Sequence, residues 1–411
     1  MITRGKGITR RDFIATAAAG IVGAGLSGVH AGRAGAQETI SPADTTAAQG
    51  GTIITRPLGK SGLVLPIVNM GVMTAENPEV VRAAYDIGVR LFDTAAYYQG
   101  GKNEEMVGRV IKDLGVRDEV VIATKIYTPD MRRGDTPADT RRKMLKQIDE
   151  CLARLKTDHV DILYVHNVDA ADIVNDDAIR DAMEEIRASG KTRFTGVTTH
   201  KNMHEVVGAV ASTGRYDVVL TAINVTMADY TDLLSAISSA SKAGVGVVAM
   251  KTQAGGRRFP LPVDMNEYSG SIINTTSLKW VLRMPDIHTA IPGFTSFEHM
   301  REDFSVAYGL EYTEQEKCLL RDCDLKVGLG FCRQCGVCVA SCPSGADIPA
   351  MMRAHMYAAQ YSDFEKASDT YRGIERGRGV EACRGCGTCR AVCPHAVRIA
   401  GRIGELKMLY A

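Results

Sequence analysis

Between residues 52 and 310, short runs of β-branched and other apolar residues alternate with longer segments whose apolar positions recur every three or four residues. The short runs are typical of buried strands and the longer segments of amphipathic helices, so the alternation predicts repeated βα units and a parallel sheet. The expected strands are Ile67–Gly71, Arg90–Asp93, Val120–Lys125, Asp161–His166, Arg193–Thr198, Val218–Asn224, Gly246–Met250 and Thr289–Pro292. The helices expected between them include Pro78–Ile87, Asn103–Leu114, Thr136–Leu155, Asp177–Ala188 and Met203–Ser212.

Eight consecutive βα units close most readily into an α/β fold of the (β/α)8 TIM barrel type, and about 250 residues is its usual size. An open doubly wound sheet is the alternative. In a barrel the catalytic groups lie at the carboxyl ends of the strands. Asp93, Lys125 and His166 end three predicted strands, and Tyr98 follows the second strand closely. Each could simply be a polar residue at a strand end, but their convergence on one face predicts a catalytic site.

Two cysteine segments follow the barrel, and residues 332–343 and 383–394 share the spacing C-x2-C-x2-C-x3-C-P. Three thiolates at this spacing can surround one cubic iron–sulfur cluster, and the fourth Cys of each segment ligates the other cluster in two-cluster ferredoxins. The spacing disfavours zinc and a disulfide framework, the two alternatives. One 4Fe-4S cluster is therefore assigned to Cys332, Cys335, Cys338 and Cys393, and a second to Cys383, Cys386, Cys389 and Cys342.

Three further cysteines and one histidine are candidates for a functional role. Cys151 lies between apolar residues of a helical pattern, which predicts a core position. Cys318 and Cys323 could form a disulfide, but buried thiols are the favoured interpretation. His200 stands at the predicted barrel mouth, where it could contact substrate, although an exposed loop histidine is the commoner case.

The N-terminal region has the composition of an export signal. A basic start precedes an apolar stretch from Phe13 to Val29, and Ala34-Gly35-Ala36 is a small-x-small cleavage pattern. The segment from Thr9 to Ile14, with its paired arginines, resembles the twin-arginine (Tat) consensus, which is read by a machinery that carries folded proteins. We therefore expect a periplasmic or otherwise exported protein, with the Tat machinery as a partner and no stable membrane span after cleavage.

The charge of the chain gives no indication of nucleic-acid binding, because the formal net charge is +1 and no basic run is interleaved with aromatic residues.

The expected organisation of the chain has six parts. They are a signal peptide over 1–36, a disordered tether over 37–51, the barrel over 52–310, a helical linker over 311–331, a small ferredoxin-like domain over 332–400 and a C-terminal tail over 401–411.

The segment from Phe92 to Tyr98, continued through Gly101, Glu104 and Gly108, resembles the aldo-keto reductase family, as do stretches from Thr55 to Gly293. The cysteine region is similar to a ferredoxin-type extension found on one subgroup of that family. This resemblance implies hydride transfer between a nicotinamide and a small carbonyl or alcohol substrate. It makes Tyr98 the acid, with a pKa depressed by Lys125, while Asp93 holds Lys125 and His166 hydrogen-bonds the carbonyl oxygen. Tyr97 is expected to pack or to line the pocket.

The same resemblance implies that NADP or NAD is the cofactor. The residues implied as its contacts are Gly71, Val72, Met73, Thr198, Thr199, Met250, Lys251, Pro292, Gly293, Phe294, Thr295, Glu302 and Asp303. The chain departs from the family pattern at Thr199, where the family has Asn, and at Leu220, where it has Gln. The basic pair that commonly binds the 2′-phosphate falls on Gly293 and His299, although Arg301 is close enough in sequence to substitute.

Two functions are consistent with these features. The first is an exported reductase whose clusters exchange electrons with a redox partner protein. The second is an electron-transfer iron–sulfur protein on a barrel scaffold that has lost nicotinamide chemistry. The intact catalytic residues favour the first function, and the altered cofactor contacts favour the second.

Overall fold

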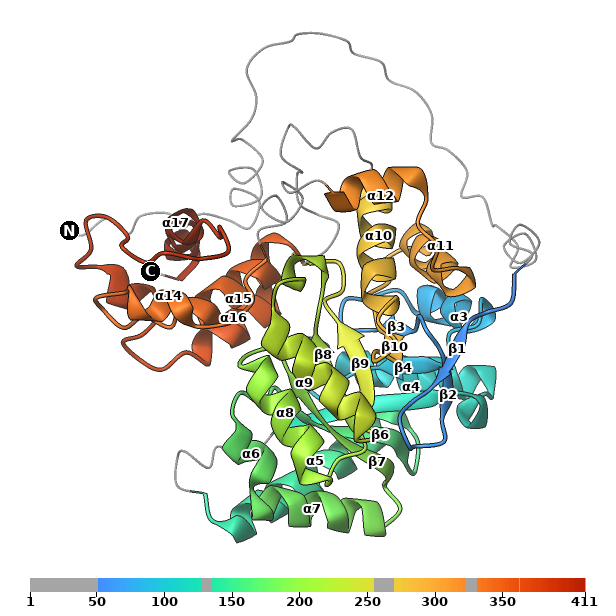
Figure 1. Cartoon of the computed structure of the whole chain (residues 1–411). Helices are drawn as coiled ribbons and strands as arrows, with labels where there is room; N and C mark the ends of the chain where they lie inside the picture. Colours follow the sequence, from blue (N-terminus) through green and yellow to red (C-terminus); the bar gives the residue numbers. More distant parts are fainter. Residues whose placement is uncertain (1–50, 128–134, 255–269, 322–330, 362, 411) are drawn as a thin grey trace, which may run out of the picture.

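The computed structural model describes residues 51–127, 135–254, 270–321, 331–361 and 363–410 (Figure 1). The predicted signal peptide, nearly all of the predicted tether and Cys323 lie outside these residues. Within the described residues, no helix is both long enough and apolar enough to cross a membrane.

Eight parallel strands form the sheet at the centre of the molecule, and each pairs with its neighbour in sequence order. Parallel bridges from Val68 to Ala290 and from Gly71 to Gly293 join the first and last strands, so the sheet closes on itself. This closure confirms the barrel and excludes the open sheet. The strands are β3 (Met70–Gly71), β4 (Leu91–Asp93), β5 (Val121–Tyr127), β6 (Val160–His166), β7 (Thr192–Thr199), β8 (Val218–Ala222), β9 (Gly246–Met250) and β10 (Thr289–Ala290).

Amphipathic helices pack around the barrel and begin close to where the sequence predicts them. In α5 a capping box fixes the start, because the Thr136 hydroxyl accepts from the Asp139 amide and the Asp139 carboxylate accepts from the Thr136 amide. The helices around the barrel are α3 (Pro78–Asp86), α4 (Lys102–Leu114), α5 (Pro137–Leu155), α6 (Ala171–Asn175), α7 (Asp177–Ala188), α8 (Met203–Thr213), α9 (Thr231–Lys242), α10 (Gly270–Leu282) and α11 (Phe297–Ser305).

The barrel interior is a separate apolar core. Leu91, Ile162, Leu220 and Val248 are among the strand residues that fill it. A preceding antiparallel hairpin of β1 (Thr55–Pro57) and β2 (Val64–Pro66) adds Leu58 and Leu65 to this core. Leu58 packs against Gly246 at the start of β9, so the hairpin covers the amino ends of the strands and leaves the carboxyl ends for a site.

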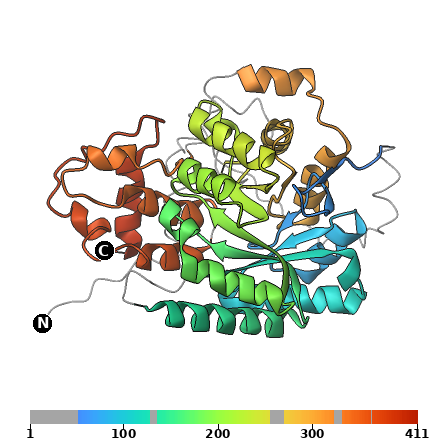
Figure 2. The same ribbon diagram turned by 60° about the horizontal axis from the view of Figure 1, so that its bottom comes forward.

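The C-terminal region forms a small helical domain beside the barrel, and both views show it on the same side (Figures 1 and 2). After α12 (Glu314–Arg321) it contains α14 (Val337–Ala340), α15 (Ile348–Ala359), α16 (Phe364–Arg372) and α17 (Ile399–Tyr410). The predicted tail is thus mostly helix, since Ile403 and Leu406 of α17 are buried in the core of this domain. Arg333 ties the domain to the barrel, because its guanidinium donates to the Thr226 carbonyl and pairs with Asp229 at 2.7 Å.

Candidate functional site

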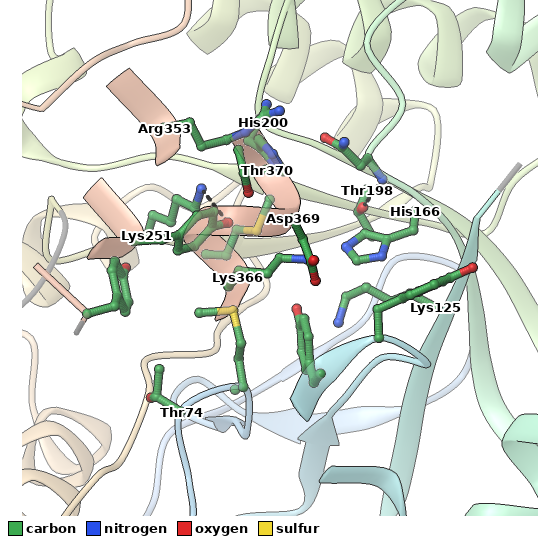
Figure 3. Close-up of a pocket in the computed structure, with 18 of the residues that line it drawn as sticks. Thr74, Lys125, His166, Thr198, His200, Lys251, Arg353, Lys366, Asp369 and Thr370 are labelled. Carbon is green, nitrogen blue, oxygen red and sulfur yellow. Dashed lines mark hydrogen bonds between the residues drawn. The ribbon is translucent and has the colours of Figure 1, made fainter. Parts of the chain in front are cut away.

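A cavity of about 740 Å³ lies between the carboxyl ends of the barrel strands and the C-terminal domain (Figure 3). One wall comes from strand ends and the loops that follow them, and the other from α15 and α16. The sequence reasoning missed the second wall. The segment Ile348–Ala359 is apolar at most positions, which indicates a helix covered on more than one face, but the sequence does not show which segment covers it.

Asp93 and Lys125 form a buried ion pair at the floor of this pocket. The Lys125 ammonium donates to the Asp93 carboxylate and, at 2.6 Å, to the Thr94 carbonyl. Both side chains are at most 3% exposed. Burial raises the pKa of Asp93 and lowers the pKa of Lys125, while each charge favours the ionised form of the other. Lys125 is thereby fixed in position next to the Tyr98 ring, with its nitrogen 5.0 Å from the ring centroid.

Tyr98 and His166 face each other across the pocket, with ring centroids 6.2 Å apart. Burial lowers the pKa of His166 well below its usual value, and the nearby cations Lys366 and Lys125 lower it further. His166 is therefore neutral near pH 7 and has one N–H to donate. Tyr98 begins the 3-10 turn Tyr98–Gly101 directly after β4, which is why Asp93 and Tyr98 share one edge of the barrel.

The pKa of Tyr98 corrects one expectation. Lys125 was expected to depress it, but burial raises it well above the usual value, and the charge of Asp93 adds to the rise. The physical reason is that burial disfavours the ionised phenolate, and this effect is larger than that of any neighbouring charge. Tyr98 therefore keeps its proton in this state of the pocket, as a proton donor requires. Tyr97 is 46% exposed, packs edge-on against Tyr127 and lines the pocket, in line with the lesser role expected for it.

The residues implied as cofactor contacts divide into two groups. Those that line the pocket are Gly71, Met73, Thr198, Met250, Lys251, Pro292, Gly293 and Thr295. Those that do not line it are Val72, Thr199, Phe294, Glu302 and Asp303. Val72 and Phe294 are fully buried in the core between barrel and helices, and the Thr199 hydroxyl donates to the Lys201 carbonyl at 2.9 Å. Asp303 accepts from the Gln253 amide at 2.6 Å.

The structure locates the residues at which the chain departs from the family's cofactor-binding pattern. Leu220 points into the barrel core and does not line the pocket. His299 lines the pocket and its Nδ1 lies 2.7 Å from the Thr295 hydroxyl. Arg301 is exposed and donates to the Phe297 carbonyl of its own helix, so it does not reach the pocket as a substitute cation.

His200 and Cys318 also differ from expectation. His200 is only 8% exposed and lines the pocket, because α15 covers the barrel mouth where an open loop was expected. Cys318 is exposed rather than buried, and its sulfur accepts from Arg321 at 3.3 Å. Cys151 is fully buried in the core between the barrel and its helices, as predicted.

The eight cluster cysteines gather in two sets. Cys332, Cys335 and Cys393 lie close enough to Cys338 to raise the pKa of its thiol, in addition to the larger effect of burial. Cys342, Cys386 and Cys389 do the same for Cys383. The described residues contain no group of three or more metal-binding side chains placed to hold a single ion. A cubic cluster spreads its ligands over separate iron atoms, and two sets of four thiols fit that donor requirement.

The first cysteine set lies next to the catalytic pocket. A small second cavity is lined by Cys332 and Arg402 from the C-terminal domain and by His200 and Lys251 from the barrel. His200, Lys251 and Arg353 line both cavities, so a thin layer of side chains separates the cysteine set from the pocket.

Comparison with known proteins identifies two domains. Residues 68–267 match the Aldo/keto reductase family, and residues 331–398 match a 4Fe-4S dicluster domain. L-galactose dehydrogenase of Arabidopsis thaliana is 28% identical over 288 residues, which are 62% of this chain and 88% of the relative. An uncharacterised oxidoreductase of Bacillus subtilis is 32% identical over 217 residues, which are 48% of this chain and 66% of the relative.

Among solved structures, an aldo-keto reductase from Klebsiella pneumoniae in complex with NADPH superposes with a TM-score of 0.52 and 23% identity. The superposition covers 66% of this chain and 94% of that one. The likeness shows that the two proteins share the barrel fold.

Proposed function

From an aldo/keto reductase domain joined to a 4Fe-4S dicluster domain, we propose an exported oxidoreductase that transfers hydride between NADP or NAD and a small carbonyl or alcohol substrate. The observation that carries the proposal is the buried Asp93–Lys125 pair beside Tyr98 and a neutral His166 in one pocket. The NADPH bound to the Klebsiella pneumoniae relative supports the choice of cofactor.

In the reduction direction, a carbonyl compound, NAD(P)H and one proton give an alcohol and NAD(P)⁺. The nicotinamide supplies the hydride when it is bound. Tyr98 donates its proton to the carbonyl oxygen, and the His166 N–H holds that oxygen where negative charge develops. Lys125 stabilises the phenolate that remains, and Asp93 keeps Lys125 in place. Thr198, Met250 and Lys251 are the pocket residues assigned to hold the cofactor.

Tyr98→Phe tests this assignment. We expect kcat for carbonyl reduction to fall by about 10²- to 10⁴-fold with NADPH affinity unchanged, since the hydroxyl acts on the substrate. Tyr97→Phe is the matched control, and its effect should be small because Tyr97 packs on Tyr127 at the pocket edge. The opposite ranking of the two variants would move the acid to Tyr97.

The C-terminal domain is proposed to hold two 4Fe-4S clusters that exchange single electrons with a redox partner protein. The grouping of the eight cysteines supports this, and so does the position of Cys332 next to the pocket. We expect about eight iron atoms per chain. Cys393→Ala should damage the cluster bound by Cys332, Cys335 and Cys338, as measured by iron content and electron paramagnetic resonance. Loss of only the cluster bound by Cys383, Cys386 and Cys389 would reverse the assignment.

The alternative function, an electron carrier without nicotinamide chemistry, is favoured by Leu220 in the barrel core and by the absence of Arg301 from the pocket lining among the described residues. The discriminating measurement is nucleotide content. Protein purified from the periplasm, denatured and analysed, should release close to one NAD or NADP per chain. Nucleotide-free protein with no affinity for added NADH or NADPH would establish the alternative.

Export through the twin-arginine pathway rests on the residues from Thr9 to Ile14. Replacing Arg10 and Arg11 by Lys should retain the protein in the cytoplasm with its iron intact, as measured by cell fractionation. Unchanged delivery to the periplasm would contradict the proposed route.

A further inference from the structure

We propose that α15 and α16 give the pocket an anion-binding site that selects substrates with a carboxylate close to the reacting carbonyl or alcohol carbon, that is, short oxo and hydroxy acids. Arg353 and Lys366 are the residues that bind the carboxylate, assisted by Lys251. The inference rests on the proposed reductase function and adds a substrate class to it.

Three cations converge on the pocket from two domains (Figure 3). Arg353 comes from α15, Lys366 from α16 and Lys251 from the end of β9. None of the three forms an ion pair with any residue in the described ranges. The contacts of Lys251 are with Tyr357, whose hydroxyl lies 3.5 Å from the ammonium and whose ring centroid lies 5.2 Å away. Within the described residues, Arg353 and Lys366 therefore have no carboxylate paired with them, and the nearest negative partner of Lys251 is the thiol of Cys332.

The carboxylates near the pocket rim are engaged elsewhere. Asp347 accepts from the Ala350 amide at 3.1 Å, which caps α15, and it also lies 3.9 Å from Lys201. Asp369 pairs with Arg372 at 3.4 Å. Glu375 pairs with Arg378 at 3.5 Å. In the described structure none of these three carboxylates forms an ion pair with Arg353 or Lys366.

Buried polar atoms in the same wall point to a polar ligand. Nη1 of Arg353, both polar side-chain atoms of Gln360 and Nδ1 of His166 are buried without a hydrogen-bond partner in the described structure. Gln360 is only 2% exposed and lines the pocket. Buried donors and acceptors are nearly always paired in folded proteins, so a ligand with acceptor oxygens is the expected partner at this position.

The mutual repulsion of the cations supports an anion as that ligand. Arg353, Lys366 and Lys251 line the same pocket, and like charges held at short range repel one another. An anion bound among them would offset this repulsion. A carboxylate also suits the planar fork of an arginine.

The location relative to Tyr98 identifies the anion as part of the substrate. The Lys366 ammonium lies 6.0 Å from the Tyr98 ring centroid, and Lys366 exerts the largest effect of any single charge on the pKa of His166. An anion held by Lys366 is thus next to the oxygen that Tyr98 and His166 act on. Nucleotide phosphates are the other source of the same chemistry, and Lys251, which follows β9, is the one of the three cations that is also assigned to hold the cofactor.

The test uses full-length, iron-loaded protein and the probes pyruvate and phenylglyoxylate, each compared with its methyl ester. The variants are Lys366→Met, Arg353→Met and the double variant. Arg376→Gln is the matched control, since Arg376 is an exposed cation of the same domain outside the pocket. Two quantities are measured: the ratio of kcat/KM for acid to kcat/KM for ester, and the Kd of each acid by calorimetry in the absence of turnover.

We expect each single variant to lower the acid-to-ester ratio and the acid affinity by about 10- to 100-fold, the range for a hydrogen bond to a charged group, with the Kd of NADPH changed less than twofold. The control should resemble the wild type. Equal losses for acid and ester, or failure of the wild-type protein to bind either acid, would overturn the inference. A loss of NADPH affinity would assign the cations to nucleotide phosphates instead. Wild-type protein that binds the acids but reduces none would leave the anion site in place and overturn the reductase function.

Discussion

The barrel has an extensive apolar core between its strands and helices and a small core in its interior, where it buries the Asp93–Lys125 ion pair, whereas the C-terminal domain surrounds its cysteines with one small core. In that small core the cysteines are themselves part of the packing, since Cys338 is buried and Cys332 and Cys383 pack against its edge. Small domains that cannot bury enough apolar surface commonly depend on metals. We therefore expect the stability of the barrel to be independent of iron and the second wall of the pocket to depend on it.

Removing iron should have the largest effect and should separate the two regions. Chelation under anaerobic conditions is expected to unfold residues 331–410 and leave the barrel folded, because binding energy at a cluster is folding energy for the domain that holds it. Hydrogen exchange measured on peptides of both regions checks this. Cys318→Ser is a suitable control, since Cys318 is exposed and lies outside both cysteine sets. Joint unfolding of the barrel would contradict the comparison.

Lys125→Met should lower the stability of the barrel and leave the C-terminal domain unchanged. It leaves the Asp93 carboxylate buried and unpaired, which typically costs about 3–5 kcal/mol in the free energy of unfolding. Trp280, the single tryptophan of the chain, lies in α10 and packs against the barrel core, so its fluorescence during urea unfolding reports the barrel. The double variant with Asp93→Asn should recover part of the loss. Lower iron content in Lys125→Met would show that the two regions are coupled more tightly than proposed.

Arg333→Gln tests the contact that holds the C-terminal domain against the barrel. The Arg333 side chain is 8% exposed and its guanidinium contacts the Thr226 carbonyl, so its removal leaves a buried acceptor unpaired, at a cost of about 1–3 kcal/mol. We expect weaker binding of acid substrates with iron content unchanged, and a decrease in the stability reported by Trp280 no larger than this cost. Unaltered acid binding would mean that other contacts suffice to hold α15 over the pocket.

The smallest effect concerns pH. The pKa of Lys251 is lowered to about 7 in the folded protein from 10.5, so between these values the unfolded chain binds more protons and the free energy of unfolding rises with pH. The contribution is at most about 1.4 kcal/mol per pH unit. Lys251 is faced by Arg353, Lys366 and Cys332. Lys251→Met should remove this rise, as measured by urea unfolding from pH 7 to 10. If the free energy of unfolding rises with pH as steeply in the variant as in the wild type, Lys251 is not the group responsible.

The barrel could be predicted from the sequence because its information is local and periodic. Each strand is a short apolar run, and the residues Asp93, Lys125 and His166 end those runs, so topology alone brings them to one edge. The cysteine sets are similarly local, since their spacing carries the chemistry.

The second wall could not be predicted, because it depends on packing between segments far apart in sequence. Arg353 and Lys366 are ordinary helix residues until α15 and α16 are placed over the barrel mouth. The burial of His200 follows from the same placement and was missed for the same reason. The raised pKa of Tyr98 was missed because it depends mainly on the burial of the phenol and then on the nearby charge of Asp93, neither of which the spacing reveals.

If α15 and α16 fold only when iron is bound, as we expect, the wall they form imposes an order on the maturation of the protein. A chain that has folded its barrel but not yet acquired iron has the proton donor and lacks the proposed carboxylate contacts of Arg353 and Lys366. Substrate choice is therefore completed last, when the metal is inserted. In a cell short of iron, the immature population would be a reductase of low selectivity, and iron supply would set specificity as well as yield.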